Sequence, residues 1–143
     1  MCVEQQIDTI QQNIVSRFTE MDDPLFTYEM LLDTARRYPS LPACYKIDEF
    51  KVEGCQSQAW LHLTCENDRF MLMGESDTLV VRGIIALLAE AFNGQRCEDV
   101  ALAPVDYLQK AGVMDTFDAT RRSGIGKIVE TIQVFAHEHS LAR

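Results

Sequence analysis

The sequence predicts an α+β domain in which helices pack against a small antiparallel sheet of three strands. Apolar residues recur at spacings of three and four near both ends of the chain, which is typical of amphipathic helices. In the middle they alternate, which is typical of strands. The length of 143 residues fits a single domain over residues 1–143, and no internal repeat divides it.

Two amphipathic helices are predicted before the sheet. The first lies within residues 4–20, where one face carries Ile7, Ile10, Ile14 and Phe18. The second begins after Asp23, whose carboxylate is suited to cap a helix, and Pro24 is suited to the first helical turn. Pro39 ends the second helix. The acidic side chains of both helices are expected to form a solvated face.

The sheet is predicted from the spacing in the middle of the chain. Residues 59–65 alternate as a strand, Glu66–Asp68 turns the chain, and residues 69–73 return as the partner strand. A third, shorter strand is expected within residues 46–52, because its last two apolar residues would share a face.

Helical spacing returns after the sheet. One helix is expected from residue 76 to a stop at Asn93-Gly94, and short helical pieces are expected over residues 98–102 and 105–110. A last helix carries one apolar stripe, made of Ile125, Ile128, Val129, Ile132 and Phe135.

The charge balance excludes several classes of partner. The chain has 13 Lys and Arg against 22 Asp and Glu, a net charge of −9, so we expect no nucleic-acid binding and no anionic membrane surface. No apolar run approaches the ~20 residues of a membrane span. The polar, acidic first ten residues are unlike a targeting segment, so a cytoplasmic location is expected.

The five cysteines are an odd number, and in a cytoplasmic protein they are expected to be reduced. Cys2 has the position of a passenger thiol near the terminus. Cys44, Cys65 and Cys97 lie at the edges of apolar segments, where free cysteine usually behaves as a small buried hydrophobe. None of the five forms a C-x-x-C pair, so we expect no structural zinc and no other metal site.

Cys55 has a different context from the other cysteines. It follows Gly54 and precedes three small or polar residues between two strand-like segments, so its thiol can lie at a loop tip. A thiol in such a place reacts if its neighbours stabilise the thiolate. From these residues alone, a reactive thiol and an ordinary turn cysteine both stay open.

Near the start of the last helix, two motifs have both a functional and a structural interpretation. Arg121 and Arg122 could steer a partner or favour an anionic sulfur species, or could simply pair with nearby acids. The stretch Ser123–Lys127 looks like a phosphate loop, but it lacks the earlier glycine and the Ser or Thr after the lysine.

Three segments in order make the sequence recognisable. Residues 52–61 (VEGCQSQAWL) closely resemble the signature of the SufE-like family, the sulfur acceptors of cysteine desulfurases. Gly74–Asp77 with residues 81–86 (VRGIIA) looks like the family's turn and following helix, and residues 120–125 (TRRSGI) look like its arginine-containing helix start. The resemblance covers about residues 5–140, and departs from the family pattern at Ala59 and Arg122.

The resemblance implies a compact α+β domain similar to the iron–sulfur scaffold fold. It implies that Cys55 receives persulfide sulfur from a PLP-dependent cysteine desulfurase, stimulates that enzyme, and passes the sulfur to an iron–sulfur assembly scaffold. The PLP belongs to the partner, so this accessory protein is expected to be no enzyme and to bind no cofactor. Other positions of the family's motif match residues of the active loop or of partner contact: Gly54, Gln56, Ser57, Trp60, Asp77 and Arg121.

Such chemistry needs a mobile loop, because the donor's sulfur lies in a pocket. We expect Cys55 to alternate between an extended pose and a resting pose sheltered near Trp60.

Three alternative functions remain. An iron–sulfur scaffold would need convergence of Cys44, Cys55 and Cys97. A cysteine hydrolase would need His62 or His137 as a base for Cys55. An adaptor would act by binding alone.

Overall fold

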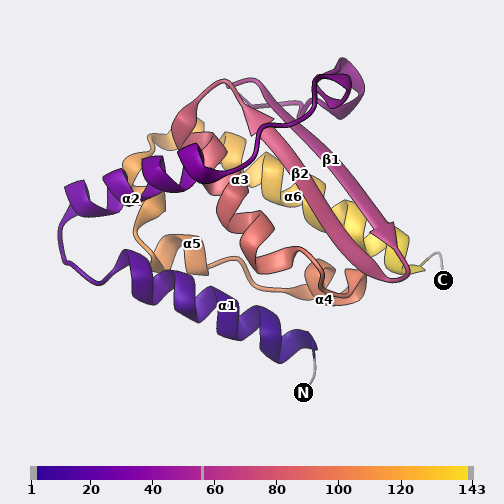
Figure 1. Ribbon diagram of the computed structural model, residues 1–143, viewed down its shortest axis with the longest axis horizontal. Coiled ribbons are helices and arrows are strands. Elements are labelled where there is room, and N and C mark those ends of the chain that lie inside the picture. Colours follow the sequence, from indigo (N-terminus) through magenta and orange to yellow (C-terminus); the bar gives the residue numbers. More distant parts are fainter. Residues whose placement is uncertain (1–2, 56, 142–143) are drawn as a thin grey trace.

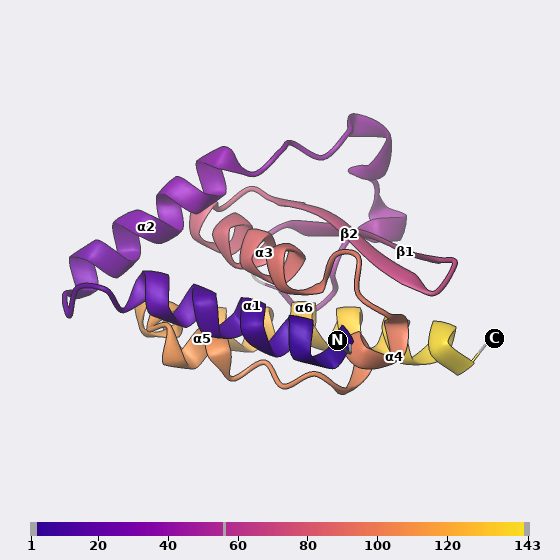
Figure 2. The same ribbon diagram turned by 60° about the horizontal axis from the view of Figure 1, so that its bottom comes forward.

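A computed structural model describes residues 3–55 and 57–141 as one layered α+β fold, which confirms the predicted class (Figure 1). The hairpin lies over α3 and α6, and α1 lies on the other side of α3 (Figure 2). None of the described helices is both long and apolar enough to cross a lipid bilayer. The elements are α1 (Val3–Phe18), α2 (Pro24–Arg37), β1 (Ala59–Glu66), β2 (Arg69–Ser76), α3 (Leu79–Phe92), α4 (Cys97–Leu102), α5 (Tyr107–Lys110) and α6 (Ala119–Leu141), with short 3₁₀ turns at Ala43–Tyr45, Asp48–Phe50 and Val113–Thr116.

Both N-terminal helices form where their sequence predicts. The Asp23 carboxylate accepts a hydrogen bond of 3.0 Å from the Leu25 amide, which caps α2 at its start. Ile14 and Phe18 of the predicted stripe on α1 are fully buried. Periodicity and capping therefore suffice to place these two helices.

The sheet has two strands in the described residues, so the prediction of three is wrong. β1 and β2 pair antiparallel from Ala59 opposite Ser76 to Glu66 opposite Arg69, around a turn with two positive-φ residues. The segment expected to be a third strand makes a single bridge, from Lys51 to Trp60. It contains the 3₁₀ turn Asp48–Phe50 instead, and the turn Ala43–Tyr45 precedes it. The ring of Phe50 lies 5.1 Å from that of His62 on the hairpin, and the preceding Tyr45 stacks on His62 with 3.8 Å between ring centroids.

Helix α3 forms the centre of the core between the hairpin and the N-terminal helices. A Cβ at Gly83 would lie 2.7 Å from Leu31 Cδ1, so glycine lets α2 and α3 approach closely. Beside this crossing, Arg82 Nε lies 3.3 Å from the Glu75 carboxylate, and the Arg82 guanidinium also donates to the Tyr38 carbonyl. Burial raises the pKa of the Tyr38 phenol, whose oxygen accepts from the Gly74 amide.

A disulfide joins Cys65 of β1 to Cys97 at the start of α4, so the expectation of reduced thiols is wrong for these two residues. The partners are separated by 32 positions in the sequence. They meet because α3 returns the chain to the open edge of β2, where the Phe70 amide donates to the Gln95 carbonyl. A pairing that depends on this return is not visible in the local sequence.

Reducing this disulfide should lower the free energy of unfolding by about 2–4 kcal/mol, because the crosslink restricts the unfolded chain. The measurement is urea unfolding at equilibrium with and without a dithiol reductant. A Cys97→Ser variant should unfold at the same urea concentration in both conditions, since it has no crosslink to lose. Equal midpoints for the reduced and oxidised wild-type protein would contradict the prediction.

Candidate functional site

Cys55 lies in a loop, residues 53–58, that leads into β1 and is closed at its base. We call this segment the Cys55 loop. The Val52 amide donates a hydrogen bond of 2.8 Å to the Ala59 carbonyl, which ties the two ends of the loop together. Gly54 has a φ of 82°, a left-handed conformation that favours glycine. The sequence requirement for Gly54 before Cys55 is therefore a requirement of backbone geometry.

The Cys55 loop rests on one stripe of α6 whose residues are three positions apart. A Cβ at Gly54 would lie 3.4 Å from Lys127 Cγ, and a Cβ at Gly124 would lie 3.0 Å from Cys55 Sγ. Positions three apart share a helix face, so the stripe continues to Arg121, which contacts Ser57. The Cys55 sulfur therefore sits against the bare backbone of Gly124, half-buried beside the core.

The C-terminal end of the loop is held by side chains from two other elements. The buried Ser57 hydroxyl accepts hydrogen bonds from Arg121 Nη1 at 2.6 Å and from Thr78 Oγ1 at 2.9 Å. The Gln58 amide donates to Asp77 Oδ1 at 3.0 Å, and the Asp77 amide donates to the Gln58 carbonyl at 3.1 Å. Asp77 and Arg121, which lie far apart in the sequence, thus fix the same end of the loop.

The two other residues singled out from the sequence are Gln56 and Trp60. Gln56 lies outside the described residues. Trp60 follows Ala59 on β1 and by strand alternation points to the opposite face, where Lys46 Nζ lies 5.3 Å from its ring centroid. The surface that shelters the sulfur is therefore supplied by α6. The sequence instead predicts a resting position near Trp60.

The Cys55 thiol packs against α6, and hydrogen bonds fix both ends of the loop that carries it. Lys127 and Arg121 place two cationic side chains on the same helix face as the sulfur seat. His62, the base that a hydrolase would need, is stacked on Tyr45 and lies edge-on to Phe50 at 5.1 Å. This arrangement suits a nucleophilic thiol that meets a reactant brought by another molecule.

The cysteines that an iron–sulfur scaffold would need do not converge. Cys97 is bonded to Cys65, Cys44 is exposed on a 3₁₀ turn, and Cys55 rests on α6. Within the described parts of the chain, one group of three potential metal ligands comes together, and it excludes Cys55.

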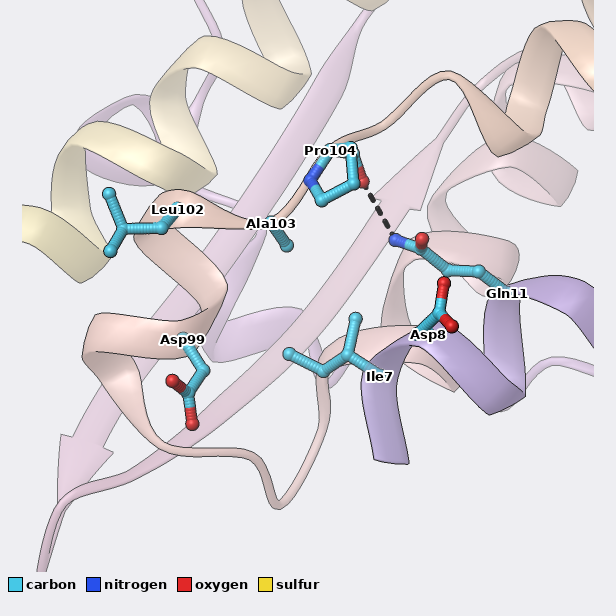
Figure 3. Close-up of a pocket in the computed structure, with 7 residues that line it drawn as sticks. All are labelled: Ile7, Asp8, Gln11, Asp99, Leu102, Ala103 and Pro104. Carbon is cyan, nitrogen blue, oxygen red and sulfur yellow. Dashed lines mark hydrogen bonds between the residues drawn. The ribbon is translucent and has the colours of Figure 1, made fainter. Parts of the chain in front are cut away.

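A pocket of about 330 Å³ lies away from the Cys55 loop, between α1 and the end of α4 (Figure 3). Asp8, Asp99 and Gln11 are among the residues that line it. The Gln11 side-chain amide donates a hydrogen bond of 2.8 Å from Nε2 to the Pro104 carbonyl. Its lining includes no cysteine or histidine, so the thiol chemistry of this chain is separate from it.

Sequence reasoning missed the residues beneath the sulfur. Gly124 and Lys127 belong to the stretch that resembles a phosphate loop, and the structure places both inside α6. A glycine within a long helix costs about 1 kcal/mol relative to alanine. That cost applies equally to Gly124 and Gly126 of α6, so it could not by itself single out Gly124.

Replacing Gly124 with valine should push the Cys55 sulfur out of its seat and raise the rate of thiol alkylation severalfold. The reason is steric, because the first added carbon already lies 3.0 Å from the sulfur. The rate is measured by peptide mass after timed iodoacetamide treatment of a Cys2→Ser/Cys44→Ser protein. Gly126→Val is the matched control, since a Cβ at Gly126 has no neighbour within 4 Å among the described residues. Equal rates in both variants would refute the role of Gly124.

Comparison with known proteins identifies a family and several relatives. The SufE family, described as the Fe-S metabolism associated domain, matches residues 12–136. An uncharacterized SufE-like protein of Synechocystis is 30% identical over 123 residues, covering 86% of this chain and 77% of that protein. The sulfur acceptor protein CsdE of Escherichia coli is 27% identical over 123 residues, covering 85% of this chain and 82% of CsdE. The solution structure of a hypothetical protein from Thermus thermophilus has the same fold, with a TM-score of 0.74 at 20% identity over 90% of this chain and 94% of that one.

Proposed function

Because this chain belongs to the SufE family of Fe-S metabolism associated domains, we propose that it accepts persulfide sulfur on Cys55 from a PLP-dependent cysteine desulfurase. The sulfur then passes toward iron–sulfur cluster assembly. The observation that carries the proposal is the placement of Cys55, on a loop whose described hydrogen bonds lie at its two ends, with its sulfur against the backbone of Gly124.

The transfer is a thiol–persulfide exchange with no net oxidation. The Cys55 thiolate attacks the terminal sulfur of the donor's persulfide, a new sulfur–sulfur bond forms on Cys55, and the donor's bond breaks. The donor cysteine leaves as a thiolate and takes up a proton. The reaction needs a nucleophile, access and orientation, so the chain acts as an accessory protein to the enzyme that generates the persulfide.

The contacts of the loop support a hinged movement of the thiol. Val52 and Ser57 are anchored by hydrogen bonds, while Cys55 rests on Gly124 through van der Waals contact alone among the interactions described for it. Cys55 is two residues from Ser57, so it can swing up to about 7 Å from that anchor. Leaving the seat breaks no described hydrogen bond of Cys55, which keeps the energetic cost of the extended pose low.

Asp77 and Arg121 serve this movement by keeping the far end of the loop in place. Because Arg121 holds Ser57 in place, the C-terminal end of the loop stays fixed while Cys55 moves.

The test is the rate at which a purified cysteine desulfurase releases sulfur from cysteine, with and without this chain. We expect a saturable increase as the chain is titrated in under reducing conditions. No increase with any cysteine desulfurase of the host organism would overturn the proposal.

A further inference from the structure

We propose that the reduced form of this chain binds one zinc ion through Cys65, Asp68 and Cys97, at the turn of the hairpin. Their potential ligand atoms, two sulfurs and a carboxylate oxygen, all lie within 4.8 Å of one another. In the structure the two sulfurs form a disulfide, so the crosslink and the metal are alternative states of one site.

The hairpin and the start of α4 bring these ligands together. Cys65 is the penultimate residue of β1, Asp68 occupies the hairpin turn with a φ of 63°, and Cys97 is the first residue of α4. The turn is held to α4 by a bridge between Arg69 and Arg96. The fold therefore completes a ligand set in which Cys65 and Asp68 are close in the sequence and Cys97 is 32 positions from Cys65.

The spacing is suited to tetrahedral coordination. Two thiolates at a Zn–S distance of about 2.3 Å in a tetrahedral site lie about 3.8 Å apart. The Cα atoms of Cys65 and Cys97 are 6.5 Å apart, and small side-chain rotations separate the sulfurs to that distance once they are reduced. Cys97 is fully buried, whereas Cys65 and Asp68 are half-buried, so solvent can supply a water as the fourth ligand.

The positive charge of Arg96 lies beside the ligand set. Two thiolates and one carboxylate carry three negative charges, which Zn²⁺ and Arg96 offset, although Arg96 is shared with Glu98. Arg96 Nε donates to Asp68 Oδ2 at 3.0 Å, which orients the carboxylate in the way that outer residues orient metal ligands. Arg96 Nη2 also pairs with Glu98 at 2.6 Å, which holds the guanidinium in place.

The conversion between the two states balances as ordinary thiol chemistry. A dithiol reductant breaks the Cys65–Cys97 bond, becomes a disulfide itself, and leaves two thiols on the chain. Zinc then forms two bonds to sulfur, and both thiol protons pass to solvent. A small-molecule disulfide reverses the conversion: it accepts the two electrons, leaves as two thiolates that take up protons, and re-forms the Cys65–Cys97 bond, which releases the ion.

The site is independent of the proposed sulfur chemistry. It lies at the end of β1 opposite the Cys55 loop, about 20 Å away along the strand, beside α4 and the C-terminal end of α6 (Figure 1). The zinc test can therefore fail or succeed without any bearing on Cys55.

The test titrates Co²⁺, a spectroscopic substitute for zinc, into the folded protein after anaerobic reduction and removal of the reductant. We expect one equivalent to bind, with thiolate-to-metal charge-transfer absorption and the ligand-field bands of a tetrahedral site, and Zn²⁺ should displace it. The oxidised protein should give none of these bands. This comparison uses the wild-type chain and so needs no variant to fold.

Variants then assign the ligands. Cys97→Ser should lose the charge-transfer band, Asp68→Asn should weaken metal binding at least tenfold, and Cys44→Ser/Cys55→Ser should change neither. Circular dichroism of each variant verifies that it is folded. Absence of the bands in the reduced protein, or bands that persist in folded Cys97→Ser, would overturn the proposal.

Discussion

Replacing Cys55 with serine should abolish the stimulation of a cysteine desulfurase by this chain. The hydroxyl keeps the size and the seat on Gly124 but is not ionised near neutral pH, so no nucleophile is left to take the persulfide sulfur. The measurement is sulfur release from cysteine at saturating amounts of the variant. We expect the rate of the desulfurase alone.

The matched control is Cys44→Ser, which removes another free thiol and should leave the stimulation unchanged. Calorimetric titration should show that Cys55→Ser still binds the desulfurase, because the surfaces around the loop are intact. Full stimulation by Cys55→Ser would mean that the chain acts as an adaptor by binding alone, contrary to the proposed function.

Replacing Glu75 with leucine should cost about 3–5 kcal/mol of folding stability. The substitution leaves the Arg82 guanidinium largely buried without its carboxylate, and an uncompensated buried charge is more costly than the absence of the pair. The loss is measured as the change in unfolding free energy in urea.

A double variant separates the charge effect from packing. Glu75→Leu/Arg82→Met removes both charges and keeps the apolar volume, so it should be more stable than Glu75→Leu alone. Some loss should remain, because Arg82 also donates to the Tyr38 carbonyl. A double variant less stable than the single one would show that Arg82 contributes by means other than its pairing with Glu75.

Local sequence rules account for most of the fold. The stripe on α1, the Asp23 cap of α2 and the alternation in β1 each depend on residues within a few positions, so they could be predicted. The conformation of residues 46–52 could not, because this segment can either pair along the edge of β1 or place Phe50 against His62, beside the preceding Tyr45. The outcome depends on tertiary contacts, and in the structure the ring contacts with His62 are formed.

The same distinction applies to the cysteines and the site. Cys55 stood out through its glycine neighbour and loop position, and the resemblance to a family added Asp77 and Arg121. The seat at Gly124 depends on how α6 lies beneath the Cys55 loop, which no local pattern encodes. The Cys65–Cys97 pair was missed for a similar reason, since α3 must first return the chain to the hairpin.

The central claim is that Cys55 is the residue that carries the sulfur. The most direct measurement incubates the chain with a cysteine desulfurase and cysteine, alkylates it without reductant, and locates the added sulfur by peptide mass. The account predicts one extra sulfur atom on the peptide that contains Cys55 and none on the peptides that contain Cys44 or Cys97. Extra sulfur on Cys44 or Cys97 with Cys55 unmodified would contradict it.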